Sequence, residues 1–179
     1  KNQLVQSLQQ KSQAVHNLER CAMLATPKRS HDAIEKAIRQ QIAKQKDLDS
    51  FELIKEYELT SDCLAMTLVY KNMDNDAEAY CKGAPETVLK LCKLTEQEIQ
   101  VQLDQIEQMA AQGLRVLGFA SVKWTSAPLP NAQQEFLFEF KGFIGFEDPI
   151  RTGVQKAVLK CQQAGIRVLM LTGDYPTTA

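Results

Sequence analysis

The first part of the chain carries apolar side chains at helical spacing. Leucine, valine and alanine return about every three or four positions between residues 4 and 22, which predicts one or two helices that end before Pro27. Another helix is predicted to begin at Asp32, because Glu35 follows three residues later, as in a capping box. Isoleucines then share one face of that helix. The start of the chain is therefore predicted to be helical.

The middle of the chain has the alternation that is typical of strands. Runs rich in β-branched and aromatic residues predict strands at 51–59, 63–71, 78–82, 114–122 and 136–146, the last either one bent strand or two short ones. The polar stretch 72–76 is predicted to be a turn between two of them, and 123–131, with its prolines, a loop. Such a hairpin favours an antiparallel sheet.

Two helices are predicted between these strands. Pro85 suits the first turn of a short helix that ends near residue 92. Thr95 and Glu98 form a second capping box, which opens a helix running to about residue 112. Gly113 follows at the position of a C-terminal cap. The middle of the chain is therefore predicted to be a sheet flanked by helices.

The pattern changes after residue 148. A helix is predicted at 152–164, capped by Gly165, and is followed by a continuous apolar strand at 166–171. Such a strand–helix–strand unit predicts parallel pairing and a Rossmann-like sheet. The predicted fold class is thus α/β: an α+β domain at 1–141 with an antiparallel sheet, and part of a second domain at 142–179.

Composition narrows the class of protein without naming a function. The 179 residues are 44% hydrophobic and 24% charged, which is ordinary for a soluble globular protein. No window approaches the ~20 apolar residues that cross a bilayer, so this chain alone is not expected to move an ion. Five scattered cysteines without a Cys-x-x-Cys pair indicate reduced thiols. Two widely spaced histidines give no support for a zinc site, and no metal site is predicted.

Charge is unevenly distributed along the chain. Residues 1–46 hold nine Lys and Arg against three Asp and Glu, while the whole chain has a net charge of −1. A basic face attracts anionic ligands, but solvated helix faces give the same pattern. Because no aromatic residues are interleaved with these basic ones, nucleic acid is not an expected partner.

A candidate binding site lies where a predicted strand ends. Lys82 closes that strand, and Gly83 lets a ligand approach the backbone because it has no Cβ atom. Pro85 then opens a helix, whose first N–H groups favour an anion. On the residues alone, a triphosphate-binding lysine and an ordinary surface lysine both remain open.

Three strings in fixed order resemble a known family. They are Lys-Gly-Ala-Pro-Glu at 82–86, Asp-Pro-Ile-Arg at 148–151 and Thr-Gly-Asp at 172–174. Together they resemble the cytoplasmic ATP-handling part of P-type cation-transporting ATPases: the nucleotide-binding domain plus part of the haloacid dehalogenase-like phosphorylation domain. The first string is similar to the calcium-, sodium- and proton-pump branches of the family. The phosphorylated aspartate of that family lies in Asp-Lys-Thr-Gly-Thr, a string that this sequence lacks.

The resemblance implies roles for residues of the first domain. Lys82, with Gly83 beside it, is expected to line the ATP pocket. Arg115, in Gly-Leu-Arg-Val-Leu at 113–117, is expected to reach the nucleotide phosphates. Without the resemblance, Arg115 reads as a solvent-facing residue at the start of a strand.

The adenine position departs from the family pattern. The calcium-pump branch has a phenylalanine that stacks on adenine and a lysine five residues later, whereas Leu59 and Leu64 stand at these positions here. A leucine still contacts a purine through its apolar surface, with less geometric specificity than a ring has. Tyr57 is the alternative stacking residue, although alternation along the strand leaves its direction open.

The resemblance also implies roles near the end of the chain. Asp148, Pro149 and Arg151 are expected to form the hinge between the two domains. Thr172 is expected to hold the transferred phosphoryl group, with Asp174 close by. A plain strand-to-helix turn, in which Asp174 caps the next helix, is the alternative interpretation.

The function expected from the resemblance is to bind ATP and position it for phosphoryl transfer. The acceptor is an aspartate outside this chain, Mg²⁺ offsets the phosphate charge, and the parent pump is an ATP hydrolase coupled to cation transport. The partners are ATP and the remaining domains of the pump, on the cytoplasmic side of a membrane. This fragment alone is predicted to be soluble and inactive. The alternatives are a fragment of a soluble haloacid dehalogenase-like phosphatase and an interaction module that has lost nucleotide affinity.

Overall fold

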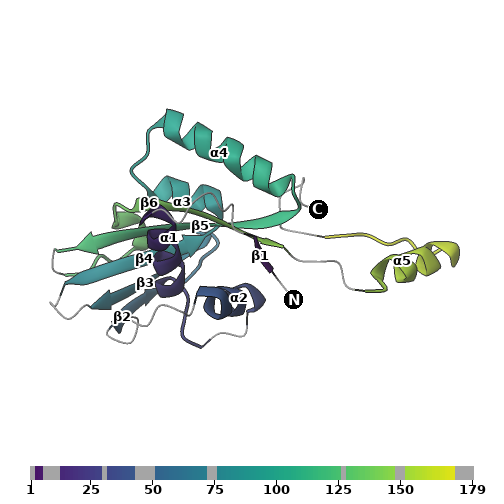
Figure 1. The fold of residues 1–179 in the computed structure, drawn as a ribbon, viewed down its shortest axis with the longest axis horizontal. Coiled ribbons are helices and arrows are strands. Elements are labelled where there is room, and N and C mark those ends of the chain that lie inside the picture. Colours follow the sequence, from purple (N-terminus) through teal and green to yellow (C-terminus); the bar gives the residue numbers. More distant parts are fainter. Residues whose placement is uncertain are drawn as a thin grey trace.

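A computed structural model describes residues 3–5, 13–29, 32–42, 51–71, 76–125, 128–147 and 152–171. In this part of the chain, six strands form one antiparallel sheet in the order β1-β6-β5-β4-β3-β2 (Figure 1). The strands are β1 (Gln3–Val5), β2 (Glu52–Tyr57), β3 (Ala65–Lys71), β4 (Ala77–Gly83), β5 (Leu114–Trp124) and β6 (Glu139–Glu147). The helices are α1 (Gln13–Leu24), α2 (Ala33–Ile42), α3 (Pro85–Leu91), α4 (Glu96–Ala110), the 3₁₀ turn η2 (Gln133–Glu135) and α5 (Val154–Gln163).

The sheet has a hydrophobic core on each face. On one face, the side chains of α1 and α2 pack on Leu68, Tyr80 and Phe119. On the other face, α3 and the segment around Phe136 pack on Val69 and other strand residues. Because side chains alternate along a strand, neighbouring residues of β3 and β4 serve opposite cores. The predicted α/β fold, with an antiparallel sheet flanked by helices, is confirmed.

The helix starts follow the predicted capping chemistry. The Thr95 hydroxyl accepts a hydrogen bond from the Glu98 backbone N–H, and the Glu98 carboxylate accepts one from the Thr95 N–H at 2.8 Å. Asp32 Oδ1 accepts hydrogen bonds from the backbone N–H groups of Ile34 and Glu35, at 2.9 and 3.0 Å. A capping box would also have the Glu35 side chain accept a hydrogen bond from the Asp32 backbone. Instead, the Glu35 carboxylate accepts a hydrogen bond from Lys82.

Two predicted elements are wrong. The helical pattern was extended back to residue 4, whereas Gln3–Val5 forms β1 and pairs with β6, whose edge would otherwise leave its N–H and C=O groups unpaired. The predicted strand at 166–171 is not a strand, because no described strand lies beside it to pair with. Its apolar side chains are exposed, up to 96% at Leu171. The predicted helix before it is present as α5.

The division into two domains stays a prediction. Strand β6 continues through the predicted boundary between residues 141 and 142, and its apolar residues Ile144 and Phe146 belong to the core beneath α1 and α2. Helix α5 has no buried residue. In the described part of the chain, no helix is long and apolar enough to span a bilayer.

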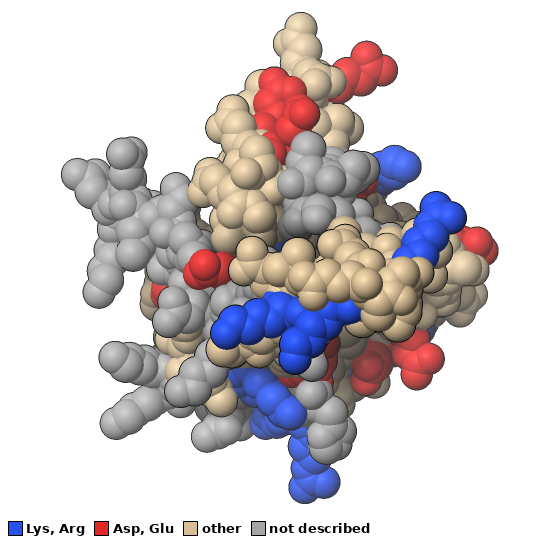
Figure 2. Space-filling view, turned by 90° about the vertical axis from the view of Figure 1, so that its right-hand side faces the viewer, with Lys and Arg blue, Asp and Glu red and all other residues tan. Residues whose placement is uncertain are grey.

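The surface charge is mixed. Figure 2 shows basic and acidic side chains on the same face of the molecule. Among the residues drawn in colour, neither sign covers the whole of that face. Such a mixture is typical of a solvated surface and does not produce a strong field of one sign.

Buried polar contacts fix the start of β3. The Gln133 side chain accepts a hydrogen bond from the Thr67 hydroxyl at 2.8 Å and donates one to the Ala65 carbonyl at 2.9 Å. The Tyr57 hydroxyl donates to the Pro130 carbonyl at 2.6 Å. These bonds hold the segment before β6 against β2 and β3, and thereby fix the backbone that carries Leu64.

Gly83 lies in close contact with the backbone at the start of β3. An added Cβ atom there would be 2.4 Å from the Leu64 carbonyl oxygen and 2.5 Å from the Ala65 Cα atom. Both are backbone atoms, so neither can turn aside as a side chain does. Only glycine fits this position without shifting a strand.

We therefore expect Gly83→Ala to lower the free energy of unfolding by about 3 kcal/mol, the upper end of the cost of overpacking. Gly113→Ala is the matched control: nothing lies within 4 Å of its added Cβ, and φ is 75°. The control should therefore cost only the backbone strain, about 1 kcal/mol. Urea denaturation measures both, and a loss at Gly83 no larger than that at Gly113 would contradict the expected overpacking.

Candidate functional site

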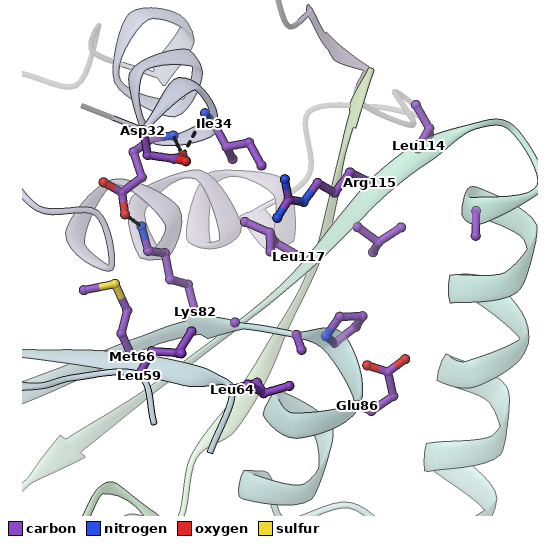
Figure 3. Close-up of a pocket in the computed structure, with 16 residues that line it drawn as sticks. Asp32, Ile34, Leu59, Leu64, Met66, Lys82, Glu86, Leu114, Arg115 and Leu117 are labelled. Atoms are coloured by element: carbon purple, nitrogen blue, oxygen red, sulfur yellow. Dashed lines mark hydrogen bonds and ion pairs between the residues drawn. The ribbon is translucent and has the colours of Figure 1, made fainter. Parts of the chain in front are cut away.

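A cavity lies where α2, β3, β4, β5 and the start of α3 meet (Figure 3). It has a volume of about 570 Å³ and brings together residues that are far apart in the sequence. We call it the lysine pocket. Its lining residues are Asp32, Ile34, Glu35, Leu59, Leu64, Met66, Lys82, Gly83, Ala84, Pro85, Glu86, Ala110, Leu114, Arg115, Val116 and Leu117.

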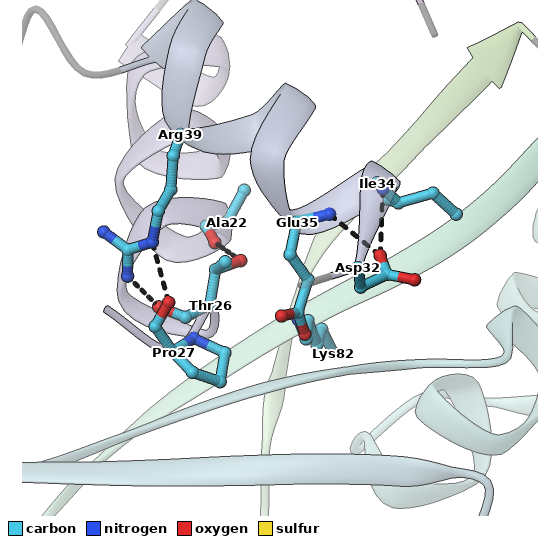
Figure 4. Close-up of polar contacts among 8 residues, drawn as sticks. All are labelled: Ala22, Thr26, Pro27, Asp32, Ile34, Glu35, Arg39 and Lys82. Carbon is cyan, nitrogen blue, oxygen red and sulfur yellow. Dashed lines mark hydrogen bonds and ion pairs between the residues drawn. The ribbon is translucent and has the colours of Figure 1, made fainter. Parts of the chain in front are cut away.

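Lys82 is the buried cation of this pocket. The residue is only 6% exposed, and its ammonium group donates a hydrogen bond to Glu35 Oε1 on α2, forming an ion pair (Figure 4). Burial lowers the pKa of Lys82 below its usual 10.5, and the Glu35 carboxylate opposes that shift. The ion pair therefore keeps a charged lysine in a place that disfavours the charge.

Hydrogen bonds to the preceding segment fix the position of helix α2, which carries Glu35. The Arg39 guanidinium donates hydrogen bonds to the carbonyls of Thr26 and Pro27, the second with Nε at 2.7 Å (Figure 4). Together with the Asp32 cap, these bonds tie both ends of the α1–α2 connection to α2. The Glu35 carboxylate is thus fixed from its own side as well as by Lys82.

The backbone beside Lys82 is exposed to the pocket. Gly83 and Ala84 line it, and the Ala84 N–H donates to the Leu64 carbonyl at 2.8 Å. Pro85 then begins α3, as the sequence predicts. The string at 82–86 therefore forms one continuous wall from β4 into α3.

An apolar wall completes one side of the pocket. Leu59 and Leu64 are 58% and 48% exposed, and Met66 lies beside Lys82 in the pairing of β3 with β4 (Figure 3). Half-exposed leucines beside a buried ion pair offer an apolar contact surface to a ligand.

Arg115 supplies the second cation. It lies at the start of β5, is exposed, and points from that strand toward the pocket, on the side away from Leu59 and Leu64 (Figure 3). The structure thus brings Lys82, Gly83, Leu59 and Arg115 together, although they come from three separate parts of the sequence.

Other predicted site residues are not brought to the pocket. Tyr57 packs in the core of the opposite face, with its ring 5.5 Å from that of Phe136, and does not line the pocket. Side-chain alternation explains this, because Tyr57 points away from the face that carries Lys82. The hinge residues Asp148, Pro149 and Arg151, and the phosphoryl-site residues Thr172 and Asp174, lie outside the described residues.

A metal site has no support in the described part of the chain, and two of its cysteines are not activated as nucleophiles. There, no group of three or more His, Cys, Asp and Glu residues is arranged to hold a metal ion. Burial raises the pKa of the Cys81 and Cys92 thiols to about 12, so neither is a thiolate near neutral pH.

The sequence did not reveal the role of Glu35. Its place three residues after Asp32 indicated a helix cap, and its ion-pair partner lies 47 residues away. No local pattern contains such a pairing. The available signal was the face of α2 that carries Glu35, because the buried Ile38 and Ile42 follow it by three and seven residues.

The chain is similar to known proteins of one family. The model of the family described as P-type ATPase, cytoplasmic domain N, matches residues 28–153. A sodium/potassium exporting P-type ATPase, cta3, from Schizosaccharomyces pombe is 38% identical in an alignment of 136 positions that covers 70% of this chain and 13% of that protein. A plasma membrane-type calcium-transporting ATPase 4 from Arabidopsis thaliana is 35% identical in an alignment of 142 positions that covers 72% of this chain and 13% of that protein. A plasma membrane calcium-transporting ATPase 2 from Oreochromis mossambicus is 35% identical in an alignment of 158 positions that covers 79% of this chain and 14% of that protein.

We expect Glu35→Gln to lower the free energy of unfolding by about 2 kcal/mol, because a buried ammonium loses its charged partner. The exposed Glu107→Gln is the control and should have little effect. Without the carboxylate, the pKa of Lys82 should fall further below the 10.5 of the unfolded chain. Between these two pKa values the unfolded state binds more protons, so stability rises with pH.

Urea denaturation at several pH values measures this. The deficit of Glu35→Gln relative to the unmodified chain should shrink as the pH is raised from about 8 to about 10. A deficit that stays constant over that range would contradict the assignment of the loss to the Lys82 charge.

Proposed function

The chain belongs to the family of P-type ATPase cytoplasmic N domains, and on this premise we propose that the lysine pocket binds ATP. The observation that carries the proposal is the composition of that pocket. A buried lysine, an exposed arginine and an apolar wall surround one cavity of about 570 Å³. A nucleotide combines the same features, because it has an apolar base and a chain of anionic phosphates.

The proposed orientation follows from the two sides of the pocket. The base lies against Leu59, Leu64 and Met66, where its faces remove apolar surface from water. The phosphates extend toward Arg115, whose planar guanidinium suits phosphate oxygens. Lys82 lies between the two. Its partner Glu35 uses Oε1 for the ion pair, which leaves Oε2 to accept a hydrogen bond from the ligand.

Charge counting supports a modest affinity and a role for Mg²⁺. Among the described residues that line the pocket, three carry carboxylates, Asp32, Glu35 and Glu86, and two are cations, Lys82 and Arg115. A free triphosphate therefore meets no excess of positive charge. The described residues offer no cluster of three acidic, histidine or cysteine ligands, so we propose that Mg²⁺ arrives with the nucleotide and reduces its charge. We expect a dissociation constant of about 0.1 to 1 mM.

We further propose that the chain acts as part of a longer cation pump. It spans 13% to 14% of the length of the relatives compared above. In that protein, ATP bound here is presented to an aspartate of another segment, with Thr172 and Asp174 at the phosphoryl site and residues 148–151 as the hinge. The pocket would then lie on the cytoplasmic side of the membrane, and the chain alone would bind ATP without hydrolysing it.

The first test is a titration of the chain with MgATP, followed by calorimetry. Arg115→Ala should weaken the binding of ATP about tenfold and leave that of adenosine nearly unchanged, because the arginine contacts only the phosphates. Lys82→Ala should weaken ATP by a similar factor. Lys90→Ala is the matched control, since Lys90 is exposed on α3 and does not line the pocket.

The Arg115 variant tests the ATP site independently of the Lys82 variant. The Arg115 variant replaces an exposed side chain and should remain folded, so its result does not depend on the stability of the Lys82 variant. If the folded, unmodified chain failed to bind up to about 10 mM MgATP, the alternative of an interaction module without nucleotide affinity would be favoured.

The apolar wall of the pocket provides a second test. Leu59→Phe should strengthen ATP binding about three- to tenfold, because a ring stacked on a base gains about 0.5 to 1.5 kcal/mol beyond its burial. Leu53→Phe is the control: Leu53 is a similarly exposed leucine, at 49%, but lies on β2 outside the pocket. The proposed place of the base would be wrong if both variants bound ATP like the unmodified chain.

A further inference from the structure

A second cavity lies at the other end of β4, on the same sheet face as the lysine pocket and beside α1. Its volume is about 370 Å³, and residues of α1, β4, β5 and β6 line it. None of them lines the lysine pocket. We call it the polar groove, because most of its lining side chains are polar. They include Asn17, Arg20, Glu78, Ser121, Lys123 and Lys141.

Arg20 is held in place before any ligand arrives. Its Nη2 donates to Glu78 Oε2 at 3.2 Å, and its guanidinium lies over the rings of Phe51 and Tyr80, at 5.4 and 5.8 Å from their centroids. The side chain is nevertheless 41% exposed. A guanidinium has five N–H donors, so this arginine keeps donors for an anion while its position is already fixed.

The buried carboxylate of the groove is already satisfied. Glu78 is largely buried, and its Oε2 accepts hydrogen bonds from both Arg20 and the Tyr80 hydroxyl. Burial raises the pKa of Tyr80, and the hydrogen bond to Glu78 raises it further, so the hydroxyl remains a donor. Glu78 therefore offsets Arg20 and does not repel a ligand as a free carboxylate would.

The remaining charges leave the groove positive. Lys141 Nζ donates to Glu139 at 2.9 Å, and that carboxylate is on the exposed rim. Lys123 lies directly across from Glu78 in the pairing of β4 with β5. Counting all these groups, three cations face two carboxylates, and the cations come from three different elements.

We propose that the polar groove binds a phosphate monoester. A phosphate has three oxygens that accept hydrogen bonds and a charge near −2 at neutral pH, which suits an arginine and two lysines converging from separate elements. The Asn17 amide and the Ser121 hydroxyl add neutral donors. The cavity is larger than a phosphate ion, so it has room for the organic group that carries the ester. This site is separate from the proposed ATP site.

The test is an NMR titration of the isotope-labelled chain with O-phosphoserine, with inorganic phosphate and with serine. Phosphoserine should shift the amide signals of Ser121 and Lys123 saturably, with a dissociation constant of about 1 mM. Tighter binding of phosphoserine than of inorganic phosphate identifies an organic ester, and equal binding identifies the free ion as the ligand. Serine should cause no shift. Saturation with MgATP should leave the phosphoserine constant unchanged.

Variants locate the site without disturbing Glu78. Lys123→Gln and Lys141→Gln should each weaken phosphoserine binding about three- to tenfold, whereas Lys90→Gln, on α3, should not. Binding should also tighten as the pH rises from about 5.5 to about 7.5, since the second phosphate proton dissociates near pH 6. The proposal is overturned if no shift occurs up to about 20 mM phosphoserine, or if the control variant loses as much affinity as the other two.

Discussion

The buried ion pair between Lys82 and Glu35 is the interaction on which the polar side of the lysine pocket depends. A lysine that is 6% exposed stays charged only if an opposite charge lies beside it. Glu35 supplies that charge from a helix whose own position is fixed by Asp32 and Arg39. The pair thus joins α2 to β4, two elements that are distant in the sequence, and sets the distance between the walls of the cavity.

Strand β4 carries most of what the sites require. Its alternate residues Glu78, Tyr80 and Lys82 face the helices α1 and α2, while the residues between them fill the opposite core. One strand therefore contributes to two separate polar cavities on the same face. Tyr80 separates them, since it packs against Tyr70 with ring centroids 6.2 Å apart and receives the guanidinium of Arg20. The alternation ends at Gly83, where β4 lies in close contact with the start of β3 and the chain then enters α3.

Local patterns in the sequence predicted local features well. The caps at Thr95 and Asp32, the turn into α3 at Pro85, and most strands of the sheet follow from spacing and turn chemistry. Pairings between distant residues did not follow. The role of Glu35 depends on a lysine 47 residues away, and β1 exists because β6 offers it an edge. Residues 166–171 have a strand-like composition, but a strand also requires a neighbour.

The two sides of the lysine pocket contribute differently to binding. Lys82 and Glu35 are paired before a ligand arrives, so both groups are already in position and a polar contact with the ligand adds about 1 kcal/mol there. Leu59 and Leu64 are about half exposed, and covering each removes apolar surface worth about 1 kcal/mol. The leucines therefore provide affinity with little geometric preference, while the ion pair and Arg115 determine orientation. A pocket of this kind would hold its ligand loosely but in a defined direction, as the proposed ATP site requires.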